Sequence, residues 1–257
     1  MRNLCFGYSL ILLFKYCGNN VITATFPGDV GTHVAKCLWF LKYHNQEPIP
    51  ETGKGEWLGR MYSLAKNKLE DEKGSPKEDK NREQLTEILK QIEQKEGEFF
   101  DLWKETREWS IELMNKVYDW AGVDFDQWYW ESDVDSESVK LVKKLYEEGK
   151  LVEDQGAIGL NLEDEKLGFA MFLKSDGNGL YSTKDLELAR RKFADFNPQE
   201  NIVVVDMRQE LHFKQVFTAF EKLGLGDASK CKHLKYNFVE LPDGAMSSRK
   251  GNIIPIT

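Results

Sequence analysis

The chain has 257 residues, of which 41% are hydrophobic and 30% are charged, a composition typical of a globular protein rather than a disordered or membrane-embedded one. Its 35 basic and 43 acidic residues give a net charge of −8, which disfavours non-specific binding of nucleic acid, because phosphates are neutralised by clustered Lys and Arg. The four scattered cysteines form no C-x-x-C pair. This pattern argues against a bound metal and predicts a cytoplasmic protein with reduced thiols.

An apolar run opens the chain. It extends from Leu4 to Phe14 and is too short to cross a bilayer as a helix. A signal peptide is the alternative, although no small-x-small cleavage site follows. We interpret the run as a buried helix that ends at Gly18 and leads into a β-branched strand, Val21 to Thr25. A glycine-containing loop, residues 27–31, and a helix from about Thr32 to Tyr43 come next.

The middle of the chain is predicted to be mainly helical. Prolines and glycines between residues 48 and 55 mark a boundary. Between Glu51 and Phe100, 22 of 50 residues are charged with both signs mixed, which indicates a solvated helical surface. Apolar and small residues then recur at three- and four-residue steps and predict one buried helix face: Phe99, Leu102, Trp103, Thr106, Ser110, Leu113, Val117 and Trp120. A later helix would end at Gly149.

The last hundred residues alternate between strand and helix. A short strand is predicted to end at Tyr181, and Ser182 has the spacing of a helix N-cap, with Asp185 three residues on. The segments that follow are an apolar strand at 202–206, a helix at about 209–223 and a short strand at 237–241. This alternation predicts an open parallel α/β sheet whose ligands bind at the carboxyl ends of its strands.

A loop with two hydroxyls and two cations lies near the end of the chain: Met246-Ser247-Ser248-Arg249-Lys250-Gly251. Such a loop can wrap a triphosphate, because hydroxyls and backbone N–H groups donate to phosphate oxygens while the cations neutralise developing charge. The alternative is a solvated basic turn.

Four polar residues follow predicted strand ends: Tyr181, Asp185, Gln209 and His212. Strand ends of a parallel sheet meet at one edge, so these side chains could face one pocket. A carboxylate there would suit a guanidinium, which pairs with it through two hydrogen bonds. The alternatives are a helix-start carboxylate favoured by the dipole at Asp185 and a structural histidine at 212.

The loop containing Gly28, Asp29 and Gly31 is a third candidate, as a possible active-site loop. Its glycines permit close backbone approach to a ligand, and the N-terminus of the following helix suits an anion. An ordinary turn with a helix cap is the alternative reading of the same residues.

Several ordered segments together resemble a class I aminoacyl-tRNA synthetase of the arginyl type. The segment VITATFPGDVGTHVAK at 21–36 is similar to the family's sequence after its ATP-binding signature, and EWLGRMY at 56–62 resembles the start of its insert. Three more segments are characteristic of the family: KSDG at 174–177, LYSTKD at 180–185 and QELHFKQ at 209–215. MSSRKG at 246–251 resembles its second signature, KMSKS.

The resemblance implies a Rossmann-like parallel-sheet nucleotide-binding core with a helical insert. Residues 1–48 would be the first part of the core, 49–157 the insert, and 158–257 the second part. The implied enzyme is an arginine–tRNA ligase: L-arginine and ATP, with its Mg²⁺, form arginyl-adenylate, and the arginyl group then passes to tRNA(Arg). We expect a monomer without membrane contact and without a covalent protein nucleophile, so positioning and electrostatics would carry catalysis.

The resemblance also assigns roles to residues. Tyr181, Asp185 and Gln209 would hold the arginine side chain, with Asp185 on the guanidinium. His212 would lie near the adenosine of ATP. The ATP-binding loop would be Met246 to Lys250, and its members implied in catalysis are Ser247, Ser248, Arg249 and Lys250.

This sequence departs from the family pattern in three places. The HIGH signature and the anticodon-binding domain are not among these 257 residues, and Ala245 stands where KMSKS has its first lysine. We therefore expect a fragment or a truncated gene model, with low stability and no arginine-dependent ATP–pyrophosphate exchange by itself. One alternative is a non-catalytic arginine- or nucleotide-binding relic. Another is a sister enzyme for a different amino acid, in which Asp185 would lack a purpose.

Overall fold

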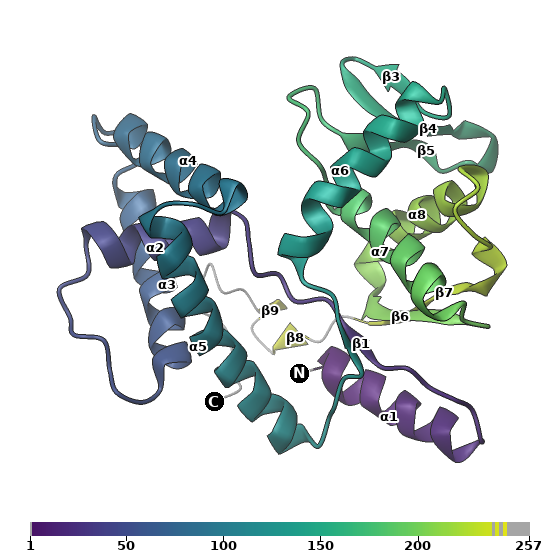
Figure 1. Ribbon diagram of the computed structural model, residues 1–257, viewed down its shortest axis with the longest axis horizontal. Helices are drawn as coiled ribbons and strands as arrows, with labels where there is room; N and C mark the ends of the chain where they lie inside the picture. The colour runs from purple at the N-terminus through teal and green to yellow at the C-terminus, as the bar shows by residue number, and fades with distance from the viewer. Residues whose placement is uncertain (1, 238–239, 242–243, 246–257) are drawn as a thin grey trace. The chain divides into compact units, whose positions relative to one another are not determined.

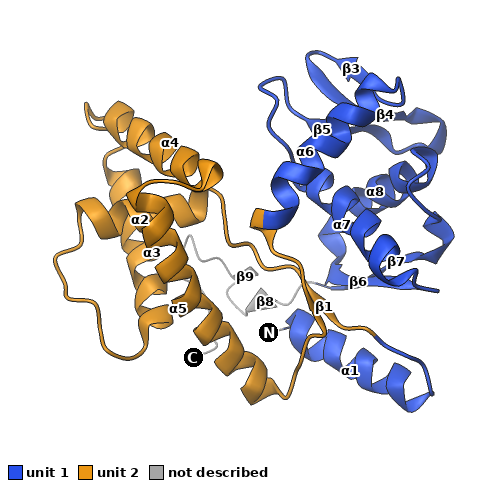
Figure 2. Cartoon of the chain, in the orientation of Figure 1, with its two compact units in different colours: residues 1–21, 133–257 blue, residues 22–132 orange. Residues whose placement is uncertain are grey.

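The computed structural model describes residues 2–237, 240–241 and 244–245. Packing divides the chain into two compact units, one formed by residues 22–132 and the other by residues 1–21 together with 133–257 (Figure 2). The expected division into a core of residues 1–48 and 158–257 and an insert of residues 49–157 stays a prediction. Among the described residues, no helix combines the length and the apolar character needed to cross a membrane.

The unit of residues 22–132 is mainly helical (Figure 1). Its helices are α2 (Thr32–Tyr43), α3 (Lys54–Asp71), α4 (Glu78–Gln94) and α5 (Glu98–Ala121). Two short strands, β1 (Ala24–Thr25) and β2 (Gln127–Trp128), pair in parallel. Helix α3 packs against α2 and α5, and α4 also packs against α2 and α5. The helical part of the sequence prediction is therefore confirmed for this unit.

Amphipathic helices form the two apolar clusters of this unit because each helix must bury its apolar stripe. The larger cluster consists of Ala35, Leu38, Trp39, Ala65, Ile88, Ile92 and Phe99. The smaller consists of Trp57, Leu58, Met61 and Trp109. Helices α3 and α5 approach closely at Gly55, where an added Cβ would lie 2.6 Å from Leu113 Cβ. Glycine is required there because it brings no side chain into the crossing.

The other unit mixes helices with short sheets (Figure 1). Its helices are α1 (Arg2–Tyr16), most of α6 (Glu131–Glu147), α7 (Tyr181–Phe196) and α8 (Glu210–Lys222). Short 3₁₀ turns occur at Glu163–Glu165, Met207–Gln209 and Ala228–Lys230. Its strands are β3 (Val152–Asp154), β4 (Ala157–Leu162), β5 (Gly168–Leu173), β6 (Asn201–Asp206), β7 (Cys231–Tyr236), β8 (Glu240–Leu241) and β9 (Gly244–Ala245).

Two kinds of strand pairing occur in this unit. Strands β6 and β7 run parallel, with Asn201 opposite Cys231 and Asp206 opposite Tyr236, and helix α8 connects them. Such a crossover helix is what joining two parallel strands requires. The parallel pairs and their helices confirm the predicted α/β class. Strands β3, β4 and β5 instead form an antiparallel sheet, and β8 pairs antiparallel with β9.

The core of this unit lies between α6, α7, α8 and the antiparallel sheet. It consists of Val142, Leu145, Leu151, Leu162, Ala170, Phe172, Leu173, Leu186, Ala189, Ala219, Phe220 and Leu223. One buried charge sits beside it on α7. Glu187 is 1% exposed and accepts hydrogen bonds from Arg190 and Arg191 at 2.7 and 2.8 Å. Burial opposes ionisation of Glu187, but the two guanidinium groups outweigh it and lower the pKa.

Several predicted elements are confirmed by the structure. The helix at 32–43 has the expected bounds, strand 202–206 lies within β6, and the helix at about 209–223 is α8. Gly18 and Gly149 have the left-handed backbone expected after a helix end, with φ of 84° and 71°.

Four expectations were wrong. Helix α1 is formed, but none of its residues 2–16 is buried, and its Phe6 ring meets the edge of Tyr236. No strand ends at Tyr181, which instead begins α7. On α5, Trp120 is 73% exposed, whereas Trp109, outside the predicted set, is buried. The expected strand 21–25 is reduced to the two residues of β1.

The strand expected at 237–241 is described only in part. Strand β7 ends at Tyr236, residues 240–241 form β8, and residues 238–239 lie outside the described part.

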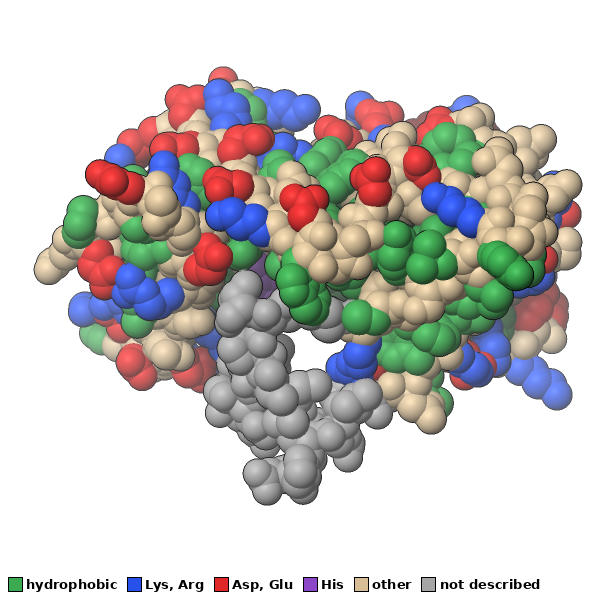
Figure 3. Space-filling view, turned by 90° about the horizontal axis from the view of Figure 1, so that it is seen from below, with side chains coloured by type: hydrophobic (Ala, Val, Ile, Leu, Met, Phe, Trp, Pro, Cys, Tyr) green, Lys and Arg blue, Asp and Glu red, His purple; other side chains and the backbone are tan. Residues whose placement is uncertain are grey.

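The charge distribution on the surface agrees with the mixed charges of the sequence. On the face seen in Figure 3, acidic and basic side chains are interspersed rather than gathered by sign. Mixed charge of this kind is typical of a solvated surface.

Candidate functional site

The start of helix α7 positions the first group of candidate residues. Thr183, fully buried, accepts a hydrogen bond from the Leu180 backbone N–H at 2.9 Å and donates one to the Phe172 carbonyl of β5. The Leu180 N–H also donates to the Phe172 carbonyl at 3.2 Å, so the hydroxyl and the backbone together tie the helix start to β5. The helix therefore begins at Tyr181 rather than at an N-cap on Ser182, and Asp185 falls in its second turn.

Asp185 and His212 form the central contact of this group. His212 Nε2 lies 2.6 Å from Asp185 Oδ2, joining α7 to the first turn of α8. Both side chains are partly buried, with 20% of Asp185 and 25% of His212 exposed. The His212 ring also meets the buried Phe213 ring edge-on at 4.9 Å. The carboxylate is thus neither sealed in the core nor free in bulk water.

A lysine adds positive charge near this carboxylate. Lys192 lies two helical turns after Asp185 on α7. Burial lowers the pKa of Lys192, and its attraction to Asp185 only partly offsets that effect. Sequence reasoning missed Lys192, although its seven-residue spacing from Asp185 places both on one helix face.

Tyr181 and Gln209 were predicted to face the same pocket as Asp185 and His212. Tyr181 is 73% exposed and lies one helical turn before Asp185, so the two share a helix face. Gln209 directly precedes α8, makes no side-chain capping hydrogen bond and is exposed. Within residues 2–237, neither side chain has a hydrogen bond to Asp185. The structure therefore brings together Asp185 and His212, and the expected roles of Tyr181 and Gln209 stay predictions.

The glycine loop lies in the other unit and is built around Asp29. The Asp29 side chain is 5% exposed and accepts hydrogen bonds from Arg107 Nε, the Ser132 hydroxyl and the Ser132 backbone N–H at 2.8, 2.8 and 2.9 Å. Trp103 Nε1 donates to the Asp29 backbone carbonyl at 2.7 Å. Three donors satisfy most of what a carboxylate can accept. This network holds the loop in place, and the role of Gly28, Asp29 and Gly31 at an active site stays a prediction.

Arg107 is held between two indoles. Its guanidinium lies 3.9 Å from the centroid of the Trp130 ring and 5.6 Å from that of Trp103. Stacking of this kind suits the planar guanidinium and supports its ion pair with Asp29. Sequence reasoning missed Arg107 and Ser132, which are 78 and 103 residues from Asp29, and no local pattern could have paired them.

A cavity of about 530 Å³ opens beside this loop. Its lining includes Gly28, Asp29, His33, Tyr62, Trp103, Arg107 and Trp130. His33 Nδ1 and the Tyr62 hydroxyl are hydrogen-bonded at 2.9 Å. Burial raises the pKa of the Cys37 thiol in the lining to about 12, which keeps it protonated and unreactive at neutral pH.

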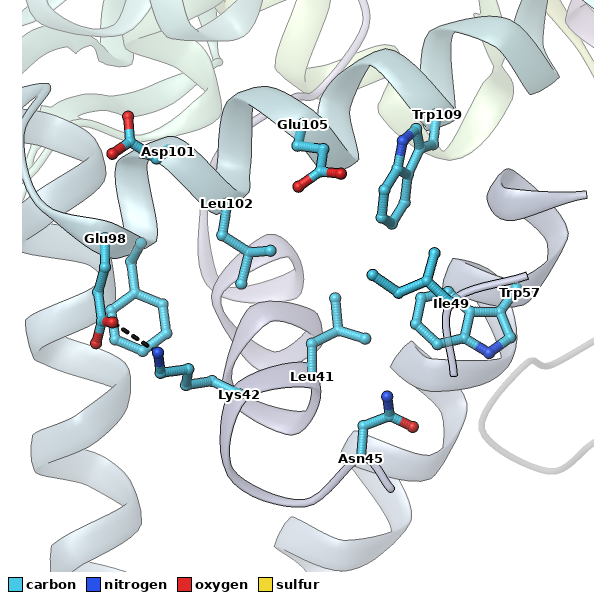
Figure 4. A pocket seen from close by; sticks show the side chains of 11 residues that line it. Leu41, Lys42, Asn45, Ile49, Trp57, Glu98, Asp101, Leu102, Glu105 and Trp109 are labelled. Atoms are coloured by element: carbon cyan, nitrogen blue, oxygen red, sulfur yellow. Dashed lines mark hydrogen bonds and ion pairs between the residues drawn. The ribbon is translucent and has the colours of Figure 1, made fainter. Parts of the chain in front are cut away.

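A smaller hollow of about 370 Å³ lies on the same unit (Figure 4). In Figure 4, Leu102, Glu105 and Trp109 project from α5 toward the side of Leu41. Lys42 Nζ and Glu98 Oε2 form an ion pair of 2.6 Å at its edge. None of the residues predicted from the sequence to bind a ligand lines this hollow.

The remaining candidates cannot be placed. Met246, Ser247, Ser248, Arg249 and Lys250 lie outside the described residues. Within the part of the chain that is described, no group of three or more His, Cys, Asp or Glu side chains could hold a metal ion.

Comparison with known proteins identifies the class of protein to which this chain belongs. A family model described as tRNA synthetases class I (R), catalytic domain, matches residues 1–257. The chain therefore belongs to the class I tRNA synthetases, in the arginyl family. It is 64% identical to the arginine–tRNA ligase of Bdellovibrio bacteriovorus over 256 residues, which cover 100% of this chain. It is 34% identical to that of Halothermothrix orenii over 99% of its length.

A solved structure shares the fold. The crystal structure of arginyl-tRNA synthetase from Plasmodium falciparum superposes with a TM-score of 0.73 at 21% identity, covering 91% of this chain and 39% of that one. The chain spans 44% of the length of each of the two curated relatives. The similarity thus concerns part of a longer enzyme in each case.

Proposed function

We propose that this chain is the arginine-activating core of an arginine–tRNA ligase. The proposal assigns it L-arginine, ATP with its Mg²⁺ and tRNA(Arg) as partners, and a monomeric form in the cytoplasm. The half-buried carboxylate of Asp185 is the observation that carries the assignment, because it combines charge, partial shelter and, within residues 2–237, a single side-chain hydrogen bond.

The reaction has two group transfers. In the first, a carboxylate oxygen of arginine attacks the α-phosphorus of ATP, and the bond from that phosphorus to the bridging oxygen of the β-phosphate breaks. Pyrophosphate leaves and arginyl-adenylate remains. In the second, a hydroxyl of the terminal ribose of tRNA attacks the carbonyl carbon and loses its proton as the new ester forms. The carbon–oxygen bond of the mixed anhydride breaks, and AMP leaves with that electron pair. Both steps depend on positioning and charge stabilisation.

The proposed arginine site uses the exposed end of α7. Asp185 would accept the guanidinium, whose planar fork of donors matches a carboxylate. Tyr181, one turn earlier on the same face, supports this reading, since its exposed ring can cover the apolar part of the ligand. Gln209, exposed at the start of α8, would supply an amide.

The proposed ATP site uses the loop from Met246 to Lys250. Ser247 and Ser248 would donate to phosphate oxygens, while Arg249 and Lys250 would neutralise the charge that develops on pyrophosphate. Mg²⁺ would arrive on the phosphates of ATP. The loop of Gly28, Asp29 and Gly31 is proposed as an active-site loop, because its glycines permit close backbone approach to a ligand.

The test is a chimaera in which this chain replaces the 256 matching residues of the Bdellovibrio bacteriovorus enzyme. We expect arginine-dependent ATP–pyrophosphate exchange. Asp185→Asn should lower kcat/KM for arginine about 100-fold, because the guanidinium loses its charged partner. Asp164→Asn, at an exposed aspartate in the 3₁₀ turn 163–165, is the matched control and should leave exchange unchanged.

Other outcomes would identify the alternatives. Equal exchange by the two variants would remove Asp185 from the arginine site. Faster exchange with an uncharged amino acid would indicate a sister enzyme. Arginine binding without any exchange by the folded chimaera would favour a non-catalytic relic.

A further inference from the structure

The hydrogen bond between His212 and Asp185 has a consequence for the proposed arginine site. At 2.6 Å, His212 Nε2 must carry a proton to donate to an ionised Asp185 Oδ2. The imidazole therefore commits this nitrogen to the carboxylate. A carboxylate has about four acceptor positions. The histidine occupies one, and no other side chain within residues 2–237 forms a hydrogen bond with this carboxylate.

The surroundings fix both partners. Asp185 sits on α7 and His212 on α8, two helices that pack against each other. The His212 ring rests against Phe213, which is 5% exposed and itself contacts Phe217 and His233. A ring supported in this way has few alternative positions. The hydrogen bond consequently limits rotation of the carboxylate of Asp185 as well.

We infer that His212 is a positioning residue for arginine: it orients the carboxylate of Asp185 so that its remaining acceptor positions face the guanidinium. The inference rests on the proposed function. The family resemblance implied that His212 lies near ATP. According to this inference, His212 instead affects binding of the amino acid. Preorganisation of this kind matters because a bidentate pair requires both carboxylate oxygens to lie in the plane of the guanidinium.

Two substitutions separate this role from simple packing. His212→Gln keeps an amide nitrogen at about the position of Nε2 and can still donate to Asp185. His212→Leu keeps similar volume and removes the donor. A histidine that only fills space would be replaced at least as well by leucine as by glutamine.

The experiment measures binding of L-arginine and of ATP to this chain by calorimetry. We expect His212→Leu to weaken arginine binding about tenfold and His212→Gln to stay within about twofold of the unchanged chain. ATP binding should be the same in all three. His44→Gln, which alters a histidine in the other unit, is the control and should change neither affinity. Circular dichroism checks that each variant is folded.

The outcomes distinguish this inference from the proposed function. Loss of arginine binding in Asp185→Asn but not in His212→Leu would overturn the inference alone. Weaker ATP binding at unchanged arginine affinity would also overturn it, in favour of a position near adenosine. Unchanged arginine binding in Asp185→Asn would refute the arginine site itself.

A second measurement needs no ligand. The sequence has only four histidines, so nuclear magnetic resonance can resolve their ring N–H signals, with His212→Gln providing the assignment. We expect the Nε2–H of His212 to be protected from exchange with water and to lose that protection in Asp185→Ala. An unprotected signal in the unchanged chain would overturn the inference even if arginine binding were too weak to measure.

Discussion

Asp29 and Asp185 are both partly or wholly buried carboxylates, yet their surroundings differ. Asp29, in the unit of residues 22–132, accepts three hydrogen bonds, and its ion-pair partner Arg107 is stacked on two tryptophans. Asp185, in the other unit, has one side-chain hydrogen bond within residues 2–237, with His212. The comparison teaches that unused acceptor positions, more than burial, separate a carboxylate that holds the fold from one that can receive a ligand.

The strongest test of this comparison is Arg107→Ala. The change leaves the Asp29 carboxylate buried without its cation, and we expect it to lower the free energy of unfolding of that unit by about 3–5 kcal/mol. Urea unfolding followed by tryptophan fluorescence measures the effect. Arg82→Ala is the control, because Arg82 is 69% exposed and pairs on the surface with Glu78 and Asp79. A loss no greater than that of the control would refute the structural role of the Asp29 pair.

Glu72 sharpens the comparison, as a third carboxylate near the surface. It accepts hydrogen bonds from Lys68, Asn81 and Lys77, which lower its pKa from 4.5 to about 2. A lowered pKa means that the stabilisation is complete above pH 4.5 and is lost as the pH falls toward about 2. Glu72→Gln should therefore reduce the acid sensitivity of thermal unfolding, by about 1 kcal/mol or less. The same decrease in melting temperature with falling pH in both proteins would contradict this.

Asp185→Asn should have the smallest effect on stability. The amide oxygen can still accept the hydrogen bond from His212, and the site is partly exposed, so we expect a loss of about 0.5 kcal/mol or less. Thermal unfolding measures it against the unchanged chain. A loss as large as that of Arg107→Ala would show that Asp185 holds the fold, and the distinction between the two carboxylates would then fail.

Sequence reasoning succeeded where the signal is local. Helix 32–43 follows a glycine and repeats its apolar residues at helical spacing, and strand 202–206 begins with four β-branched residues in a row. Strand β7 was missed because its sequence, CKHLKY, contains two lysines three residues apart and no β-branched residue. The antiparallel sheet β3–β5 was missed because β3 has only three residues, while β4 and β5 contain glycine at 159 and 168.

The candidate sites show the same limit. The start of α7 depends on the hydroxyl of Thr183, which contacts Phe172, eleven residues earlier in the chain. The helix begins at Tyr181, whereas local capping rules favoured an N-cap at Ser182. Asp185 and His212 could be expected to meet, since both were placed near one sheet edge. The partners of Asp29 could not, because Arg107 and Ser132 are far away in the sequence.

Gly55 and Gly59 lie one turn apart on α3, but they allow very different sequence variation. At Gly55 even one extra methyl group would collide with Leu113 and with the Trp109 carbonyl, whereas at Gly59 nothing lies within 4 Å of an added Cβ. Homologues that keep this helix crossing should therefore be restricted to glycine at the first position and free to vary at the second.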